Sequence, residues 1–151
     1  MISDSQALAS FLARCRVFVR EQLIPNEAKI NEEDAMPAAI VAGMRALGLF
    51  GLSIPKEWGG LGLSMEEEVL AMFELGRASP AYRSYFAISQ GGGWRVILLD
   101  GTEAQRKAYL PKIASGEWMG TIAITEPEAG SDAASLQTTA TRVGDEYVLN
   151  G

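Results

Sequence analysis

The sequence contains no histidine, which removes the side chain that most often serves as a general base or metal ligand at neutral pH. Cys15 is the only cysteine, so no disulfide can form within the chain, as is typical of a reducing compartment. No apolar run approaches the roughly 18 residues of a membrane-spanning helix, and residues 1–10 lack the features of a signal peptide. We therefore expect a cytoplasmic protein without a metal site or a membrane anchor.

Basic residues are also few and scattered. The 151 residues include 13 Lys and Arg against 19 Asp and Glu, which gives a net charge of −6 with no basic cluster. This balance argues against binding to nucleic acid or to an anionic membrane. Hydrophobic residues make up 48% of the chain and charged residues 21%, as in a globular protein, and the length suits one domain plus a piece of another.

Helical periodicity dominates the first two thirds of the sequence. Apolar residues recur every three or four positions from Leu8 to Leu23, where Pro25 is predicted to end the helix, and a second helix is expected from about Asp34 to a stop at Gly48. The glycine-rich residues 49–63 break the pattern, and Trp58 within them is read as a packing anchor or as part of an acyl pocket.

Three later helices have recognisable starts. Ser64 and Thr102 each begin a capping box, and Ser79 precedes a proline at the first helical position. For the helix after Ser64, the predicted inner face consists of Met65, Val69, Met72, Phe73 and Gly76. The sequence thus predicts an antiparallel helical bundle whose interior includes the following large apolar side chains: Phe11, Phe18, Met44, Leu47, Phe73 and Leu110.

After Gly116 the period changes from helical to alternating. Residues 118–125 and 136–143 are predicted strands, and Gly144-Asp145 is a two-residue turn into a return strand at residues 146–149. Three strands leave unpaired edges and an uncovered apolar face. The expected fold is mainly α: a helical domain over residues 1–116, followed by the first strands of a truncated, β-barrel-like domain over residues 117–151.

Residues 125–132, with the sequence Thr-Glu-Pro-Glu-Ala-Gly-Ser-Asp, carry the most specific signal. Together with residues 54–62, 101–111 and 144–151 they resemble the acyl-CoA dehydrogenase family over nearly the whole chain. The resemblance implies an N-terminal helical domain, a middle β domain and a C-terminal helical bundle. It also implies FAD as cofactor and α,β-dehydrogenation of an acyl-CoA thioester to the trans-2-enoyl-CoA.

The resemblance assigns the cofactor contacts to residues at this junction. Ile122 and Ile124 would provide apolar contacts and backbone hydrogen bonds around the flavin ring, and the Thr125 hydroxyl would face its N5 side. Gly130 would let the backbone approach the FAD pyrophosphate, and Ser131 would donate to it and lie beside the thioester substrate. Taken singly, these residues are ordinary turn formers at a strand end; as one contiguous motif they indicate a flavin site.

No catalytic base is assigned within these residues. The family's base is a glutamate of the C-terminal bundle, and no residue here matches it, so the chain is expected to be an incomplete and, alone, inactive part of the enzyme. The resemblance implies an electron-transferring flavoprotein as electron acceptor, a homotetramer when full length, and a role in fatty acid metabolism. The alternatives are an acyl-CoA oxidase or flavin monooxygenase of the same fold, and a non-catalytic helical interaction module.

Overall fold

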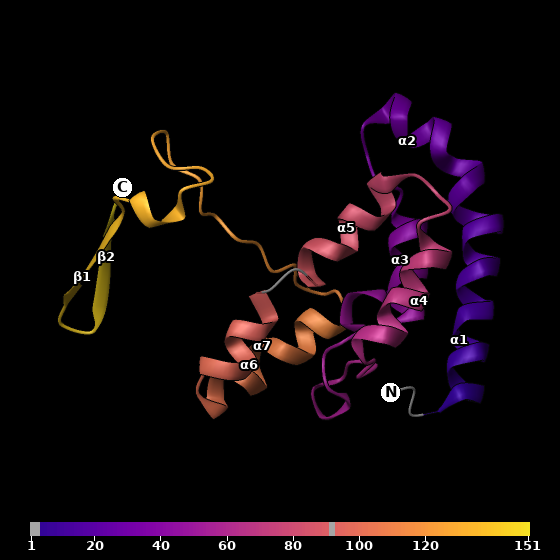
Figure 1. Cartoon of the computed structure of the whole chain (residues 1–151), viewed down its shortest axis with the longest axis horizontal. Helices are drawn as coiled ribbons and strands as arrows, with labels where there is room; N and C mark the ends of the chain where they lie inside the picture. The colour runs from indigo at the N-terminus through magenta and orange to yellow at the C-terminus, as the bar shows by residue number, and fades with distance from the viewer. Residues whose placement is uncertain (1–3, 91–92) are drawn as a thin grey trace. The chain divides into compact units, whose positions relative to one another are not determined.

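The computed structural model describes residues 4–90 and 93–151, except for the side chains of residues 88–90. The chain divides into two compact units, Met1–Thr121 and Ile122–Gly151 (Figure 1). The first unit is helical and the second contains a two-stranded antiparallel sheet. The expectation of a mainly α chain that ends in the first strands of a β region is confirmed.

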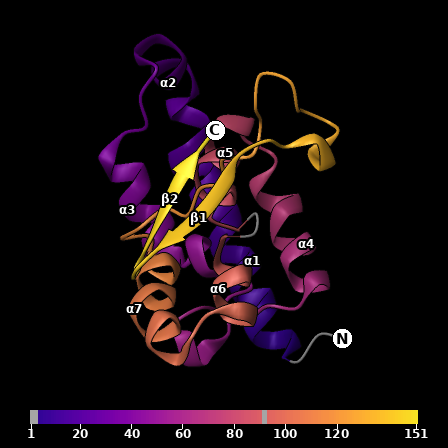
Figure 2. The ribbon, with the colours of Figure 1, turned by 90° about the vertical axis from the view of Figure 1, so that its left-hand side faces the viewer.

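The helices of the first unit follow one another with short connections. Helices α1 and α4 pack side by side, as do α6 and α7 (Figures 1 and 2). Among the described residues, none of the helices combines the length and the apolar character needed to cross a membrane. The helix bounds are α1 Ser5–Phe18, α2 Glu27–Glu33, α3 Ala38–Leu47, α4 Met65–Leu75, α5 Pro80–Gln90, α6 Gly93–Asp100 and α7 Glu103–Ala114.

The predicted helix starts are confirmed where a cap defines them. Ser64 N–H donates to the Glu67 carboxylate at 2.8 Å, and Glu67 N–H donates to Ser64 Oγ at 3.3 Å. Thr102 and Gln105 make the same reciprocal pair at α7. Each box satisfies two backbone donors that would otherwise lack a partner at the helix start.

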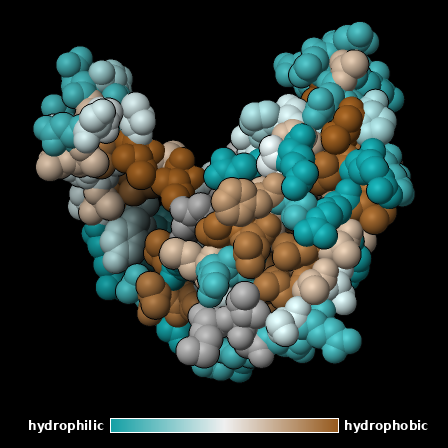
Figure 3. Space-filling model, turned by 45° about the vertical axis from the view of Figure 1, so that its right-hand side comes forward, coloured by the Kyte–Doolittle hydropathy of each residue, from teal (hydrophilic) through white to brown (hydrophobic). Residues whose placement is uncertain are grey.

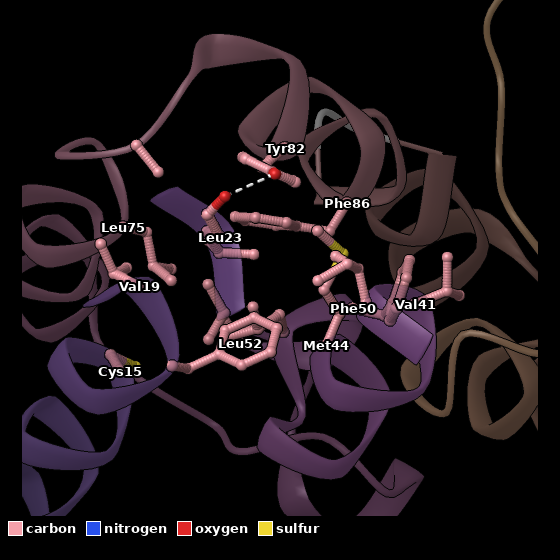
Figure 4. Close-up of a cluster of buried hydrophobic side chains, with 14 of the residues drawn as sticks. Cys15, Val19, Leu23, Val41, Met44, Phe50, Leu52, Leu75, Tyr82 and Phe86 are labelled. Carbon is pink, nitrogen blue, oxygen red and sulfur yellow. Dashed lines mark hydrogen bonds between the residues drawn. The ribbon is translucent and has the colours of Figure 1, made fainter. Parts of the chain in front are cut away.

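The chain does not leave its helical path at Pro25, contrary to the prediction. A π-helical turn, Val19–Leu23, follows α1 and leads through a 3₁₀ turn, Ile24–Asn26, into α2. This change of hydrogen-bond spacing accommodates a residue without an N–H. In this stretch the Leu23 carbonyl accepts a hydrogen bond from the buried Tyr82 hydroxyl of α5 at 2.6 Å (Figure 4).

We expect Tyr82→Phe to destabilise the helical unit by about 1–2 kcal/mol, because the buried hydrogen bond between the Tyr82 hydroxyl and the Leu23 carbonyl is lost. Urea denaturation followed by far-ultraviolet circular dichroism measures this loss. Tyr85→Phe is the matched control, since Tyr85 lies one turn away and is only partly buried. Equal losses for the two variants would show that the Tyr82 hydroxyl contributes no particular stability.

Two clusters of buried side chains form the interior of the first unit. The larger one joins α1, α3, α4 and α5 around residues such as Phe50 and Phe86 (Figure 4), and the smaller one includes Leu110 of α7. Burial of each large side chain stabilises the fold by about 1.5–3 kcal/mol. Of the predicted interior residues, Phe18, Met44 and Leu110 are buried, Phe11 and Leu47 are half-buried, and Phe73 is 70% exposed.

The predicted inner face of α4 is correct only at Met72, which is half-buried against the larger cluster. Met65, Val69 and Phe73 are exposed, whereas Glu67 and Glu74 are buried. Apolar side chains also gather on the face of the molecule that Figure 3 shows. The apolar periodicity identified the helix correctly, but the acidic side chains face inward because each has partners there. Glu67 is held in its capping box, and Glu74 forms ion pairs with two arginines.

Glu74 links α4 to α1 through its carboxylate. The oxygens lie 2.7 Å from Arg16 Nη2 and 3.2 Å from Arg77 Nε, while the Glu74 side chain is only 9% exposed. The hydrogen bond from Arg16, with the charge of both arginines, holds the pKa of Glu74 below its ordinary value against the opposing effect of desolvation. The folded state therefore binds this proton less readily than the unfolded chain does.

We expect Glu74→Gln to lower the free energy of unfolding by about 1 kcal/mol at pH 7, since both arginines are largely exposed and screened by water. A depressed folded-state pKa contributes stability above the unfolded pKa and loses it as the pH falls through the folded value. The two proteins should therefore converge in stability under acid. Glu103→Gln removes a fully exposed carboxylate from the pair with Lys107 and should have a smaller effect. A Glu74→Gln deficit that persists at acidic pH would contradict this account.

The glycine-rich residues 49–63 form two 3₁₀ turns and a tight loop instead of a regular element. Backbone bonds from Leu61 N–H to the Gly51 carbonyl and from Leu63 N–H to the Leu52 carbonyl, both 2.8 Å, close it. Trp58 packs against the smaller buried cluster, which supports its interpretation as a packing anchor. Cys15 is fully buried, and desolvation raises the pKa of its thiol to about 11, so it is a core residue as well.

The second unit contains one hairpin (Figure 2). Strands β1 (Thr139–Val143) and β2 (Glu146–Asn150) pair antiparallel with Val143 opposite Glu146, and Gly144 adopts a φ of 64° in the predicted turn. The strand predicted over residues 136–143 begins later than expected, because residues 136–138 lie outside β1. All ten strand residues are exposed, so the hairpin is defined by its turn and backbone bonds instead of a buried face.

Candidate functional site

Residues 118–125 do not form the predicted strand. They form an irregular connecting segment, with a bend at Trp118, that ends the first unit and begins the second. None of them pairs with another strand among the described residues. A strand requires a neighbour for its hydrogen bonds, and the apolar alternation alone does not supply one. Trp118, Met119, Ile122 and Ile124 are accordingly between 43% and 57% exposed.

A tight reverse turn follows this segment directly. Glu126 N–H donates to the Ala129 carbonyl at 3.0 Å, and Ala129 N–H donates to the Glu126 carbonyl at 3.2 Å, with Pro127 and Glu128 between them. Ala129 is 1% exposed. The motif of residues 125–132 is therefore a defined turn with an ordered centre.

The predicted contact residues lie at the two ends of this turn. Ile122, Ile124 and Thr125 precede it, and Gly130 and Ser131 follow it. All five are exposed, and at Gly130 a Cβ would meet no heavy atom within 4 Å. The backbone groups of Ile122, Ile124 and Thr125 form no hydrogen bond to the backbone of another described residue. These five residues are close together because they are close in the sequence, and all of them are exposed.

These observations fit the polar rim and phosphates of a dinucleotide cofactor. Two hydroxyls, of Thr125 and Ser131, can donate or accept, and Ile122 and Ile124 carry backbone donors and acceptors that pair with no other described backbone group. The space at Gly130 admits close approach of a phosphate to the backbone. Apolar side chains of Ile122 and Ile124 flank the polar groups, as a flat aromatic ring system requires.

Sequence reasoning missed the residue that secures the turn. The Glu126 carboxylate accepts hydrogen bonds from Gln137 N–H at 2.8 Å and from Thr138 N–H at 2.9 Å, and it accepts a third from the Thr138 hydroxyl. These bonds, that of the Thr138 side chain first, keep the pKa of Glu126 below its ordinary value. The carboxylate is therefore a structural acceptor here and not a catalytic base.

Comparison with known proteins gives a consistent answer. The family described as acyl-CoA dehydrogenase, N-terminal domain, matches residues 5–117. An acyl-CoA dehydrogenase of Bacillus subtilis (strain 168) is 36% identical over 136 residues, which cover 90% of this chain and 36% of that protein. A (2S)-methylsuccinyl-CoA dehydrogenase of Cereibacter sphaeroides is 41% identical over 137 residues, which cover 90% of this chain and 25% of that protein.

A solved structure agrees with the sequence comparisons. The glutaryl-coenzyme A dehydrogenase in complex with glutaryl-CoA superimposes with a TM-score of 0.86 at 35% identity, covering 100% of this chain and 39% of that one. The chain thus spans between a quarter and two fifths of the length of these relatives. With the helical unit, the signature turn and these similarities in agreement, the chain belongs to the acyl-CoA dehydrogenase family.

Proposed function

We propose that this chain acts as the amino-terminal part of a FAD-dependent acyl-CoA dehydrogenase that converts an acyl-CoA thioester to its trans-2-enoyl-CoA. The observation that carries the proposal is the exposed signature turn of residues 125–132 in a chain of this family. In this proposal residues 1–116 form the helical domain and residues 117–151 begin the β domain that contacts the cofactor.

The residues around the turn are proposed to bind and orient the cofactor, which when bound supplies the two-electron oxidation. Thr125 provides a hydroxyl to the N5 side of the ring, and the backbone of Ile122 and Ile124 hydrogen-bonds the ring edge. Gly130 leaves room at the pyrophosphate, and Ser131 donates to it and borders the thioester. These groups are proposed to position the cofactor and to stabilise it, and none of them is proposed to move the substrate proton.

Removal of the α-proton is assigned to a glutamate that the family carries in its C-terminal helical bundle. Such a base needs a carboxyl pKa raised by burial, whereas the pKa of Glu126 is lowered by its hydrogen bonds. The 151-residue chain is accordingly proposed to be inactive alone. The proposed electron acceptor is an electron-transferring flavoprotein, and the proposed assembly of the full-length enzyme is a cytoplasmic homotetramer.

We expect the isolated chain to bind FAD weakly or not at all, because the turn contacts the cofactor from one side only. Equilibrium dialysis against FAD, with the full-length protein in parallel, measures this difference. Stoichiometric flavin in the purified 151-residue chain would contradict the expectation, and a flavin-free full-length protein would contradict the proposed function.

The reaction itself is tested with the full-length, flavin-loaded protein. Acyl-CoA should reduce the flavin, and electrons should pass to an electron-transferring flavoprotein, with trans-2-enoyl-CoA as product. Hydrogen peroxide formed at the rate of substrate consumption would instead identify an acyl-CoA oxidase. Survey of straight and branched acyl chains in the same assay identifies the substrate.

A further inference from the structure

Side-chain hydrogen bonds hold both ends of the signature turn. At the first end, Glu126 reaches 11 and 12 residues along the chain to Gln137 and Thr138, immediately before β1. At the other end, the Asp132 carboxylate accepts from the Ser135 hydroxyl, and Ser135 N–H donates to the Asp132 carbonyl at 3.1 Å. All of these contacts lie within the second unit.

The contacts of Glu126 suit a carboxylate and no other side chain of its size. One oxygen accepts from Gln137 N–H, and the other accepts from both the N–H and the hydroxyl of Thr138. A carboxylate offers acceptors at both oxygens, and its charge strengthens each bond. A glutamine would place an amide NH₂ against one of these two sets of donors.

Glu126 is the first residue of the turn and directly follows the connecting segment that contains Ile122, Ile124 and Thr125. Thr125 is its immediate neighbour in the chain, and the backbone bonds between Glu126 and Ala129 define the turn that leads to Ser131. A change in the position of Glu126 therefore moves the residues proposed to contact the flavin on both sides. The hydrogen bonds from residues 137 and 138 connect this turn to the segment that enters the hairpin.

We propose that Glu126 is a positioning residue, whose carboxylate holds Thr125 and Ser131 in place for the cofactor by binding the backbone that enters β1. The proposal rests on the proposed function, and it adds to it a residue that acts through Thr125 and Ser131 without touching the substrate. Glu128 provides a matched control two residues away, since its side chain is exposed and forms no hydrogen bond or ion pair within the described residues.

The first test measures amide hydrogen exchange by NMR in the 151-residue chain. Glu126→Gln should speed exchange at Gln137 or Thr138 by about tenfold or more, the factor expected when a charge-assisted hydrogen bond is replaced by an unfavourable contact. Glu128→Gln should leave both amides unchanged. Equal exchange in the unaltered chain and in Glu126→Gln would overturn the proposal, whether or not the protein binds flavin.

The second test uses the full-length, flavin-loaded protein. Glu126→Gln should raise the dissociation constant for FAD and lower the rate of flavin reduction per bound flavin, each by about tenfold, while the melting temperature of the helical domain stays the same. Thr138→Val removes one of the three bonds and should produce smaller changes in the same direction.

The outcomes separate the two hypotheses. If Glu126→Gln and Thr138→Val bind FAD and turn over as the unaltered enzyme does, the positioning role is wrong and the proposed function stands. If the unaltered full-length protein neither retains FAD nor reacts with acyl-CoA, the proposed function is wrong, and the role of Glu126 toward a cofactor is wrong with it.

Discussion

Gly116→Ala is expected to lower the free energy of unfolding of the helical unit by about 2–5 kcal/mol. Gly116 lies just after α7 with a φ of 72°, in the left-handed region that costs an L-residue about 1–2 kcal/mol. A Cβ there would also come within 2.4 Å of the Phe50 ring, which is 1% exposed and packed in the larger buried cluster. Overpacking of this kind adds about 1–3 kcal/mol.

A matched glycine separates the two contributions. Gly59 has a φ of 87°, but a Cβ there would meet only Ala114 Cβ, at an ordinary contact distance of 3.9 Å. Gly59→Ala should therefore show the backbone cost alone, about 1–2 kcal/mol. Urea denaturation followed by circular dichroism compares the two variants, and equal losses would rule out the clash with Phe50.

A double-mutant cycle with Phe50 provides a second test of this clash. Phe50→Leu gives the new methyl group space, so the double variant should be more stable than the sum of the two single losses predicts, by about 0.5–3 kcal/mol. The Gly116 carbonyl accepts from Arg45 Nε at 3.1 Å and Nη2 at 2.8 Å. Additive effects in this cycle would indicate that Gly116→Ala acts by displacing that carbonyl instead.

Thr125→Val in the full-length enzyme is expected to slow flavin reduction by about 5- to 150-fold without loss of flavin. Valine keeps the shape of threonine and removes only the hydroxyl proposed to face the N5 side of the ring. An unpaired partner at such a position costs about 1–3 kcal/mol, which converts to this range of rates if it is felt in the transition state. Stopped-flow absorbance measures the reduction directly.

Ser131→Ala is expected to act on cofactor retention. Its hydroxyl is proposed to donate to the pyrophosphate, so the purified variant should contain less FAD, while turnover per bound flavin stays close to normal. The two variants therefore differ in kind, one slow and loaded, the other partly free of flavin. Equal flavin loss with normal turnover in both would show that the proposed roles are wrong and that the signature is only a structural turn.

Local interactions account for what the sequence alone determined. The helix starts at Ser64, Thr102 and Pro80 and the hairpin turn at Gly144 were predicted correctly because each depends on residues within three or four positions. The family was recognisable for a similar reason, since its signature is a contiguous stretch of residues 125–132.

Tertiary contacts decided which surfaces are buried and how the chain continues past a local signal. Phe73 is exposed and Glu74 buried because Arg16 of α1 and Arg77 satisfy the carboxylate, and apolar spacing carries no information about such partners. The helical path continues past Pro25, and Tyr82, 59 positions from Leu23, satisfies the carbonyl there.

The same distinction holds at the candidate site. Residues 118–125 have the composition of a strand, but a strand forms only with a neighbour to complete its hydrogen bonds, and none of the described residues supplies one. Glu126 is held by backbone groups 11 and 12 residues away, a contact without a local pattern. The proposed contact residues were selected from the sequence alone, whereas the hydrogen bonds that fix the turn between them form only in the folded chain.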